Sequence, residues 1–464
     1  MLDQRKHANS PTFTIYGWTV CFWILIIAFQ YGYHIPALNQ IQAVLTCKEK
    51  PLNAVHYGLP TCISMSEFAF SVVTAIFTVG GLLGSLIANL VMDRWGRRGA
   101  VRTSTLLTSL GAGIMGMSGS FGLLCFGRLL VGIGSGVGLC VGPIFLAEIA
   151  PSNISGNVGV LTQLGIVLGI MITQAMGLRF ATPTEWRLVL IFSSVLSAAQ
   201  LLLSVFIVES PTWLGSQLRT DEKKWTEGRL WDAALQNDSS STVERDFLLD
   251  QSEAQPEAQR NVAAITVPQL LTTQELRTPL AIICLAMASQ QLSGINAVLY
   301  YSNAILSKSL PDFGPYVSLG ITVVNVLMTF PPIILIERMG RRQLLMISTI
   351  GALTSLTAVG FGLNTGLVII PSLAILVFVM SFAVGLGPIP FVMIPEVSPG
   401  YAVSALSSVA LSLNWIVNFM VGLLFLPLRN QLSGGDSLKE GRVFYVFVGV
   451  LFMSTFALSR LYRR

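Results

Sequence analysis

The chain has 464 residues, of which 53% are hydrophobic and only 11% are charged. A typical soluble domain carries about 25% charged residues, so this composition leaves too few charges to cover a water-exposed surface. It excludes a soluble enzyme, a disordered regulator and a nucleic-acid-binding protein as descriptions of the whole chain. The net charge of +5 does not form a basic patch, because the lysines and arginines lie in short clusters between apolar runs.

Twelve apolar runs are long enough to span a bilayer, since a transmembrane helix needs about 20 mostly apolar residues. They are expected at 15–38, 67–92, 99–121, 123–149, 155–180, 187–208, 277–307, 314–337, 343–364, 367–395, 401–427 and 441–460. The alternating pattern of a membrane β-barrel is absent from these runs. The sequence therefore predicts an all-α membrane protein, and the first run is too long to be a signal peptide.

The positions of lysine and arginine predict the orientation, since cytoplasmic segments are enriched in these residues. They gather in both terminal segments and after the second, sixth and eighth runs. Both termini are therefore expected in the cytoplasm. Cys47 and Cys62 share the first loop on the opposite side, and they are candidates for a disulfide if that side is oxidising. No group of residues has metal-ligand spacing, so neither a metal nor a cofactor is expected.

One segment, 209–276, holds far more charged residues than the rest of the chain. We expect it to be a cytoplasmic linker with short helices. Within it, the stretch from Glu222 to Gln236 is predicted to form an amphipathic helix that carries Trp225 and Trp231. The following stretch, 237–259, is polar and is predicted to be mobile.

The segments on either side of the linker, 1–208 and 277–464, repeat each other. Two motifs occur once in each segment, at nearly the same offset. They are DRWGRR and ERMGRR, at 93–98 and 337–342, and AEIAP and PEVSP, at 147–151 and 395–399. Such a repeat predicts two halves of six helices each, an architecture that in membrane transporters places the substrate site between the halves.

These motifs resemble those of the sugar porters of the major facilitator superfamily, which include the facilitative glucose transporters. The resemblance extends over about 15–460 and also rests on GRLLVGIGSG (127–136), ESPTWL (209–214), QQLSGINAVLYYS (290–302), GPIPFVMIPE (387–396) and NW (414–415). It implies twelve transmembrane helices and transport of a hexose or related polyol by alternating access.

Amide side chains at membrane depth are the candidate substrate ligands. A sugar hydroxyl both donates and accepts hydrogen bonds, and asparagine and glutamine offer both functions without a charge. Their alternative role in membrane helices is to form hydrogen bonds between helices. The resemblance implies sugar binding by Gln163, Gln290, Gln291, Asn296, Asn325 and Asn414, with Trp415 stacking nearby. Asn418 is a further amide in the same span as Asn414.

The outer half of the site is expected to be gated. The resemblance implies an outer gate at Tyr300 and Tyr301, for which the alternative is aromatic packing at the membrane interface. Pro388 and Pro390 make the tenth span easy to bend, because proline removes helix hydrogen bonds. Phe391 stands where many relatives have tryptophan.

The inner gate is expected where charged residues meet at the cytoplasmic helix ends. The resemblance implies salt bridges that hold the halves together when the protein opens outward, and the alternative is a set of solvated charges. The expected participants are Arg94, Arg98, Arg338 and Arg342 with Glu148, Glu209, Glu337 and Glu396. Relatives usually carry arginine near Ser155 and near Val403, and both arginines are absent here. A weaker latch, or one built from other residues, is therefore expected.

His34 and Arg128 bear on proton coupling. Proton-coupled relatives have an aspartate in the first span, paired with an arginine of the fourth, and this chain has His34 with Arg128. His34 is a poor substitute for the aspartate, because repulsion and desolvation oppose a second positive charge beside a buried arginine. Facilitated diffusion is therefore the leading expectation. A histidine-based proton switch and a purely structural histidine stay open.

Other functions also stay open. A proton-coupled sugar symporter is one, and a sugar sensor or trafficking factor that kept the fold is another. An enzyme is not expected, since the long loop shows no catalytic constellation. The expected partners are a small sugar or polyol and the lipid bilayer, with no nucleic acid. The sequence leaves open the sugar, the oligomeric state and the choice between the plasma membrane and a vacuolar or other internal membrane.

Overall fold

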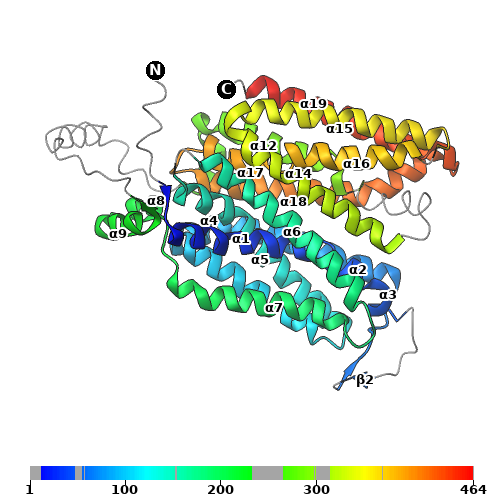
Figure 1. Cartoon of the computed structure of the whole chain (residues 1–464), viewed down its shortest axis with the longest axis horizontal. Helices are drawn as coiled ribbons and strands as arrows, with labels where there is room; N and C mark the ends of the chain where they lie inside the picture. Colours follow the sequence, from blue (N-terminus) through cyan, green and yellow to red (C-terminus); the bar gives the residue numbers. More distant parts are fainter. Residues whose placement is uncertain are drawn as a thin grey trace.

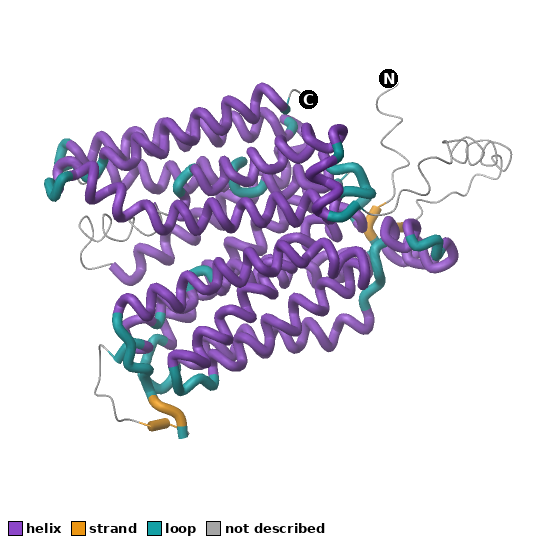
Figure 2. The backbone as a smooth tube through the Cα atoms, turned by 180° about the vertical axis from the view of Figure 1, so that it is seen from behind, coloured by secondary structure: helices purple, strands orange, loops and turns teal. Residues whose placement is uncertain are grey.

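The computed structural model describes residues 12–47, 55–56, 58–151, 154–232, 265–296, 298, 314–367 and 369–462. Its long helices run side by side in two bundles, one before the linker and one after it (Figure 1). The helices α8 and α9 of the linker lie at one end of the molecule and the strand β2 lies at the other (Figures 1 and 2). We refer to these as the linker end and the hairpin end.

The first bundle and its loops contain β1 (Thr12–Phe13), α1 (Ile15–His34), α2 (Ala37–Gln40), α3 (Gln42–Leu45), β2 (Val55–His56), β3 (Leu59–Pro60), α4 (Glu67–Gly116), α5 (Phe121–Ile149), α6 (Ser155–Phe180) and α7 (Trp186–Leu203). The short helix η1 (Ser204–Phe206) follows α7. The linker contains α8 (Pro211–Ser216), α9 (Thr220–Leu230), β4 (Trp231–Asp232), α11 (Val267–Thr272) and η3 (Gln274–Leu276). The second bundle contains α12 (Arg277–Leu292), α14 (Gly314–Met339), α15 (Arg341–Asn364), α16 (Ile369–Val384), α17 (Ile389–Val397), α18 (Val403–Ser433), η5 (Ser437–Lys439) and α19 (Arg442–Leu461).

Ten helical segments within the described residues are long and apolar enough to cross a membrane. One of them, Phe68–Gly116, contains two predicted spans. Gly96 (φ 75°, ψ −177°) interrupts the helical geometry between them, so the two spans meet at a kink. A φ of this sign is open to glycine and costly for other residues. The predicted seventh span begins as α12, which ends at Leu292. Of its later residues, 293–296 and 298 are described and 297 and 299–307 lie outside the described residues. The prediction of a multi-pass all-α membrane protein is confirmed.

Two expected helices differ from the structure. The tenth predicted span is divided into α16 and α17, and Pro388 precedes the second helix. The predicted linker helix ends at Leu230, because Trp231 pairs with Phe13 in a short antiparallel sheet of β1 and β4. The Trp231 indole also donates a hydrogen bond to the Ile149 carbonyl (2.8 Å). The predicted mobile stretch lies outside the described residues.

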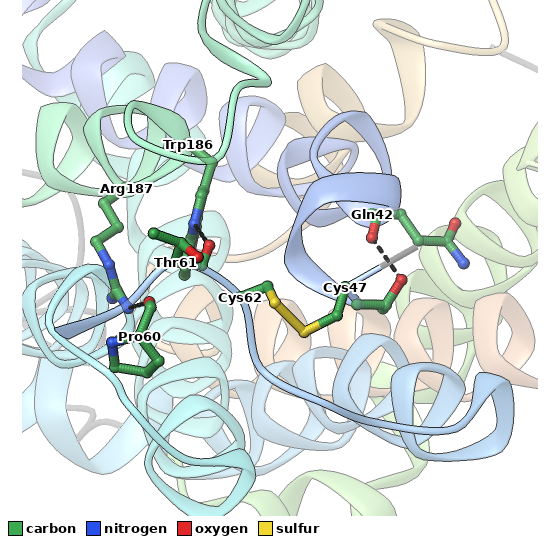
Figure 3. The surroundings of a disulfide bond; sticks show 8 residues. Gln42, Cys47, Pro60, Thr61, Cys62, Trp186 and Arg187 are labelled. Carbon is green, nitrogen blue, oxygen red and sulfur yellow. Dashed lines mark hydrogen bonds between the residues drawn. A yellow bond between two sulfur atoms is a disulfide. The ribbon is translucent and has the colours of Figure 1, made fainter. Parts of the chain in front are cut away.

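The hairpin end carries a disulfide between Cys47 and Cys62, the pair that the sequence offers as candidates (Figure 3). The segment just before Cys62 is held to the membrane helices by side-chain donors. The Trp186 indole donates to the Thr61 carbonyl (2.7 Å), and Arg187 donates to the Pro60 carbonyl (2.8 Å). The disulfide therefore ties the first loop to a segment that is already fixed on α7.

Candidate functional site

A cavity of about 220 Å³ lies between the two bundles. The first bundle lines it from α1, α4, α5 and α6, and the second bundle lines it from α12, α14, α16, α17 and α18. Seven of the lining residues are the amides singled out in the sequence, namely Gln163, Gln290, Gln291, Asn296, Asn325, Asn414 and Asn418. Amides from α6, from the segment 290–296, from α14 and from α18 thus meet in one cavity.

Five of these amides form a hydrogen-bonded chain on the wall from the second bundle. Gln291 donates to the Asn414 side-chain oxygen (3.2 Å), and Asn414 donates to the Gln290 oxygen (3.1 Å). Asn296 donates to the Gln291 oxygen (3.1 Å) and to Asn418 (2.7 Å). Gly294 has a φ of 74° between these residues, so the backbone turns there and brings Asn296 back over Gln291. The chain holds the amides in fixed orientations.

The remaining two amides face this chain from other helices. Gln163 of α6 is buried and lies against Gly387, which follows α16, so the two bundles touch at this point. Asn325 of α14 is also buried, and its side-chain oxygen has no hydrogen-bond partner among the described residues. A buried acceptor of this kind is costly unless water or a ligand satisfies it. Asn325 therefore offers an unused acceptor to the cavity.

Trp415 differs from its expected position. It is 2% exposed and is not among the residues that line the cavity. Its ring packs edge-on against Tyr31 and Phe77, with centroid distances of 5.6 Å to each. A β-carbon at Gly81 would collide with the indole, so this glycine admits Trp415 between the bundles. Trp415 supports two lining aromatic residues from behind.

Several lining residues were not predicted from the sequence. They are Tyr31, Thr74, Phe77, Thr78, Gln174, Thr322 and Phe382. Gln174 could have been found, because it lies eleven residues after Gln163, or about three turns along the same helix. Tyr31 and Phe77 carry no comparable signal, since an aromatic residue in an apolar helix usually packs in a core.

The expected gating residues are only partly described. Pro388 and Pro390 lie at the break between α16 and α17, and Phe391 of α17 lines the cavity. Tyr300 and Tyr301 lie outside the described residues. The break at the two prolines is therefore the described feature that bears on gating.

His34 and Arg128 lie side by side but have different surroundings. His34 is fully buried and is not a lining residue. The Ser193 hydroxyl donates to the Gln30 oxygen (2.6 Å), so it must accept from the His34 Nε2–H (2.6 Å). Arg128 lines the cavity, donates to the His34 carbonyl (2.8 Å) and lies over the Phe77 ring at 4.4 Å. The histidine therefore acts within the first bundle, and the arginine faces the cavity.

The charged cluster of the first bundle is buried at the linker end. Arg97 and Glu148 form an ion pair of 2.8 Å, and their side chains are 6% and 10% exposed. Glu148 also accepts from the Ser210 hydroxyl (2.5 Å). Glu209 accepts from the backbone N–H groups of Arg97 and Arg98 (2.9 and 3.0 Å). Burial raises the pKa of Glu209 above its ordinary value, although the backbone N–H groups of Ser210 and Arg98 and the charges of Arg98 and Arg97 oppose the shift.

The charged cluster of the second bundle is more exposed. Arg341 forms ion pairs with Glu396 (2.6 Å) and Glu337 (3.0 Å), and the three side chains are 21%, 28% and 34% exposed. Arg341 occupies the same position in the repeated motif as Arg97. The two clusters are therefore built from equivalent residues in different surroundings.

The assignment of Arg94 and Arg338 to these clusters is corrected by the structure. Both residues are exposed, and neither has an ion pair among the described residues. Gly96 and Gly340, with φ of 75° and 82°, turn the chain two residues after them. The arginine that follows each glycine therefore faces the glutamates, and the arginine before it faces solvent.

The two bundles touch between the cavity and the linker end. Ser85 and Ser412 share a hydrogen bond of 2.9 Å, and Ser407 donates to the Cys140 carbonyl (3.2 Å). Gly156 of the first bundle lies against Glu337 and Arg341 of the second, where a β-carbon would collide with both side chains. Within the described residues no ion pair joins the two bundles. Their contact at this end includes close packing, neutral hydrogen bonds and a hydrogen bond between the Asp93 carboxyl group of α4 and Ser404 of α18.

The sequence matches the family model described as "Sugar (and other) transporter" over residues 20–461. A probable metabolite transport protein of Saccharomyces cerevisiae is 31% identical over 436 residues, which cover 91% of this chain and 88% of the relative. The human solute carrier family 2, facilitated glucose transporter member 3, is 34% identical over 440 residues, which cover 91% of this chain and 84% of that protein.

Solved structures share the fold. The proton:xylose symporter XylE bound to 6-bromo-6-deoxy-D-glucose superimposes with a TM-score of 0.77 at 18% identity, covering 96% of this chain and 95% of that chain. A partially occluded, inward-open conformation of the xylose transporter XylE from E. coli gives a TM-score of 0.68 at 17% identity, covering 96% and 99%. This chain belongs to the sugar transporter family of the major facilitator superfamily and is a multi-pass membrane protein.

Proposed function

We propose that this protein moves a hexose or related polyol across its membrane by alternating access, as facilitated diffusion. The observation that carries the proposal is the amide-lined cavity between the bundles. Both bundles contribute lining residues, so a relative movement of the bundles changes access to the cavity. Transporters with repeated halves place their substrate sites at such an interface.

The lining chemistry suits a polyhydroxylated ligand. The amides supply donors and acceptors without a net charge, and the Asn325 oxygen is an acceptor with no partner among the described residues. The rings of Tyr31, Phe77 and Phe391 line the same cavity and suit the C–H surfaces of a sugar. The human relative is named as a facilitated glucose transporter, and the structural relatives are named as xylose transporters.

Facilitated diffusion is favoured over proton coupling by the position of His34. Its ring is fully buried and donates to Ser193 inside the first bundle. A proton carrier must exchange protons with the side of the membrane to which the cavity opens, and this histidine does not line the cavity. We therefore expect transport that does not need a proton gradient.

The proposed orientation places the linker end in the cytoplasm. The Cys47–Cys62 disulfide lies at the hairpin end, and disulfides persist on the oxidising side of a membrane. The last residues of α19 lie at the linker end (Figure 1). This orientation agrees with the excess of lysine and arginine in the linker and in the terminal segments.

The test is uptake of labelled glucose, fructose, xylose and polyols into proteoliposomes, with and without an imposed proton gradient. We expect saturable uptake of at least one of these that does not depend on the gradient. Gln291→Ala removes two hydrogen bonds of the amide chain and is expected to lower kcat/KM by about tenfold to a hundredfold. The control is Gln343→Ala, which changes an exposed amide of α15.

Each part of the proposal has its own contrary result. Uptake that requires the gradient would reject facilitated diffusion, and His34→Ala would then be measured next. Equal kinetics for Gln291→Ala and Gln343→Ala would reject the amide site. If folded protein takes up none of these compounds, transport of a sugar or polyol is rejected and the sensor or trafficking function replaces it.

A further inference from the structure

A second cavity, of about 420 Å³, lies at the linker end of the first bundle, away from the substrate cavity. We call it the inner cleft. Its walls come from the linker-end turn of α4, from the segment 204–209 that follows α7, from α8 and α9, and from the first turn of α1. The proposed transport cycle assigns this cleft no role.

The inner cleft carries an excess of positive charge. Four arginines line it, Arg98, Arg102, Arg219 and Arg229, against the two glutamates Glu209 and Glu222. Glu222 is bound by Arg219 (2.8 Å), and Glu209 accepts from backbone N–H groups. Within the described part of the chain, no carboxylate lies within ion-pair distance of the other three arginines. The cleft therefore has a surplus of guanidinium donors.

Two of these arginines converge on one short segment. Arg98 and Arg102 are four residues apart in a helix, so their side chains lie on the same face. Arg98 donates to the Ile207 carbonyl (2.8 Å), and Arg102 donates to the hydroxyl and the carbonyl of Ser204 (2.8 and 3.1 Å). Each guanidinium has five N–H groups, so both keep donors for a further acceptor. Two guanidinium groups side by side are a favourable site for a phosphate.

The inner cleft also holds an indole donor without an acceptor. Trp213 of α8 lines the cleft, and its buried Nε1–H has no hydrogen-bond partner among the described residues. A buried donor is normally satisfied, so an acceptor from outside the protein fits this position. This observation is independent of the arginines and indicates the same kind of ligand, one with several oxygen acceptors.

The surroundings of the inner cleft place it at the membrane surface. The potential span that contains α7 ends at Phe206, and Val205 and Phe206 line the cleft with 65% and 70% of their surfaces exposed. Trp95 and Trp225, which also line it, are 54% and 59% exposed. Tryptophan is enriched where acyl chains meet headgroups. The cleft therefore adjoins a lipid-facing apolar surface on one side and faces water on the other.

We propose that the inner cleft binds the phosphate headgroup of an anionic phospholipid from the leaflet on the linker side. The phosphate lies between Arg98 and Arg102, and the acyl chains lie along Val205 and Phe206. The headgroup thereby joins α4 to the linker helices and stabilises their contact. This binding does not depend on which sugar the protein carries.

The test measures lipid binding to the purified full-length protein by native mass spectrometry and by thermal unfolding. The probe is dioctanoyl phosphatidylinositol 4-phosphate, and the comparators are dioctanoyl phosphatidylcholine and inositol 1,4-bisphosphate. We expect the anionic lipid to bind more tightly than either comparator and to raise the Tm. Arg102→Gln and Arg229→Gln are each expected to weaken its binding about fivefold, the effect of one basic residue near an anionic membrane surface.

The matched control is Arg460→Gln, because Arg460 is an arginine near the end of α19 and does not line the inner cleft. Its binding is expected to equal that of the unchanged protein. If Arg102→Gln and Arg229→Gln bind the anionic lipid as tightly as Arg460→Gln does, the proposal is overturned. If inositol 1,4-bisphosphate binds as tightly as the lipid, the proposal that the ligand is a phospholipid is rejected, and a soluble phosphate compound is identified as the ligand. Arg229 is exposed, so Arg229→Gln tests the site even if Arg102→Gln fails to fold.

Discussion

The charged clusters at the linker ends of the two bundles arise from the same repeated motifs but differ in burial and in partners. In the first bundle Arg97 and Glu148 are almost fully buried, and the linker adds Ser210. In the second bundle Arg341 shares its charge between two glutamates that are partly exposed. Repetition of a motif has therefore conserved the ion pair and changed its environment.

This difference assigns the clusters different mechanical roles. A buried ion pair holds firmly the helices that carry it, because separating the two residues leaves a charge unpaired in the low-dielectric interior of the protein. The first cluster joins α4, α5 and α8 in this way. The second cluster lies against Gly156 of the other bundle, and its charges can regain water when the bundles separate. The first cluster is thus a fixed joint, and the second is part of a contact that opens.

The largest expected difference between the clusters is in how much the free energy of unfolding falls when the arginine of each cluster is replaced. Arg97→Ala leaves Glu148 buried without its cation and is expected to cost about 3–5 kcal/mol. Arg341→Ala removes two partly exposed ion pairs, with Glu396 and Glu337, and is expected to cost about 1 kcal/mol. Unfolding of the two variants by denaturant in the same detergent measures both values. Equal losses would contradict the division into a fixed joint and an opening contact.

A smaller effect is expected when only the linker's contribution to the first cluster is removed. Ser210→Ala takes one hydroxyl donor from Glu148 and the side-chain cap from α8, and we expect a loss of about 2 kcal/mol. Ser398→Ala is the control, since that hydroxyl lies just after α17 and donates to the Ile394 carbonyl of the same helix. Unfolding of both variants gives the comparison. A loss for Ser210→Ala no greater than for Ser398→Ala would show that the linker does not strengthen the joint.

The contact of the second cluster is tested by adding one methyl group. Gly156→Ala places a β-carbon against the flexible ends of the Glu337 and Arg341 side chains, which must shift, so the contact between the bundles is expected to loosen at the linker end. We expect the equilibrium to shift by less than tenfold toward the separated state, because moving flexible side chains costs less than the roughly 1.4 kcal/mol that a tenfold shift requires. The distance between spin labels on Arg94→Cys and Arg342→Cys reports this change. Gly400→Ala has open space for its β-carbon and is expected to leave the distance distribution unchanged.

The smallest effect concerns pH. Because burial raises the pKa of Glu209, the folded protein binds this proton more tightly than the unfolded chain does. The stability of the unchanged protein relative to Glu209→Gln is therefore expected to fall as pH rises from the ordinary value for glutamate through the raised value, and to level off above it. Melting temperatures of both proteins between pH 4 and pH 8 measure the trend. A relative stability that rises with pH in this window would contradict it.

The sequence predicts much of this architecture because a membrane span and a buried amide both leave local signals. The ends of the apolar runs agree with the ends of most observed helices to within a few residues. The amides stand out because polar groups are costly inside a bilayer, and all seven line one cavity.

The errors concern contacts between residues far apart in the chain. The motif alone does not reveal the direction of the chain after Gly96, so it does not predict that Arg97 rather than Arg94 pairs with the glutamate. The end of α9 depends on the pairing of Trp231 with Phe13, which no local pattern encodes. The position of Trp415 depends on the space above Gly81 in the other bundle. Each of these features is decided by packing between elements.

The pairing of β1 with β4 brings the start of the described chain beside the end of α9, so the first bundle closes on itself. Thr14 reinforces this closure, because its backbone N–H donates to the Leu230 carbonyl (3.0 Å). A cut made after Asp232 therefore leaves both strands in one fragment. The protein thus offers a natural place to be produced as two polypeptides, the first carrying its own closing strand pair and the second carrying the helices from α11 onward.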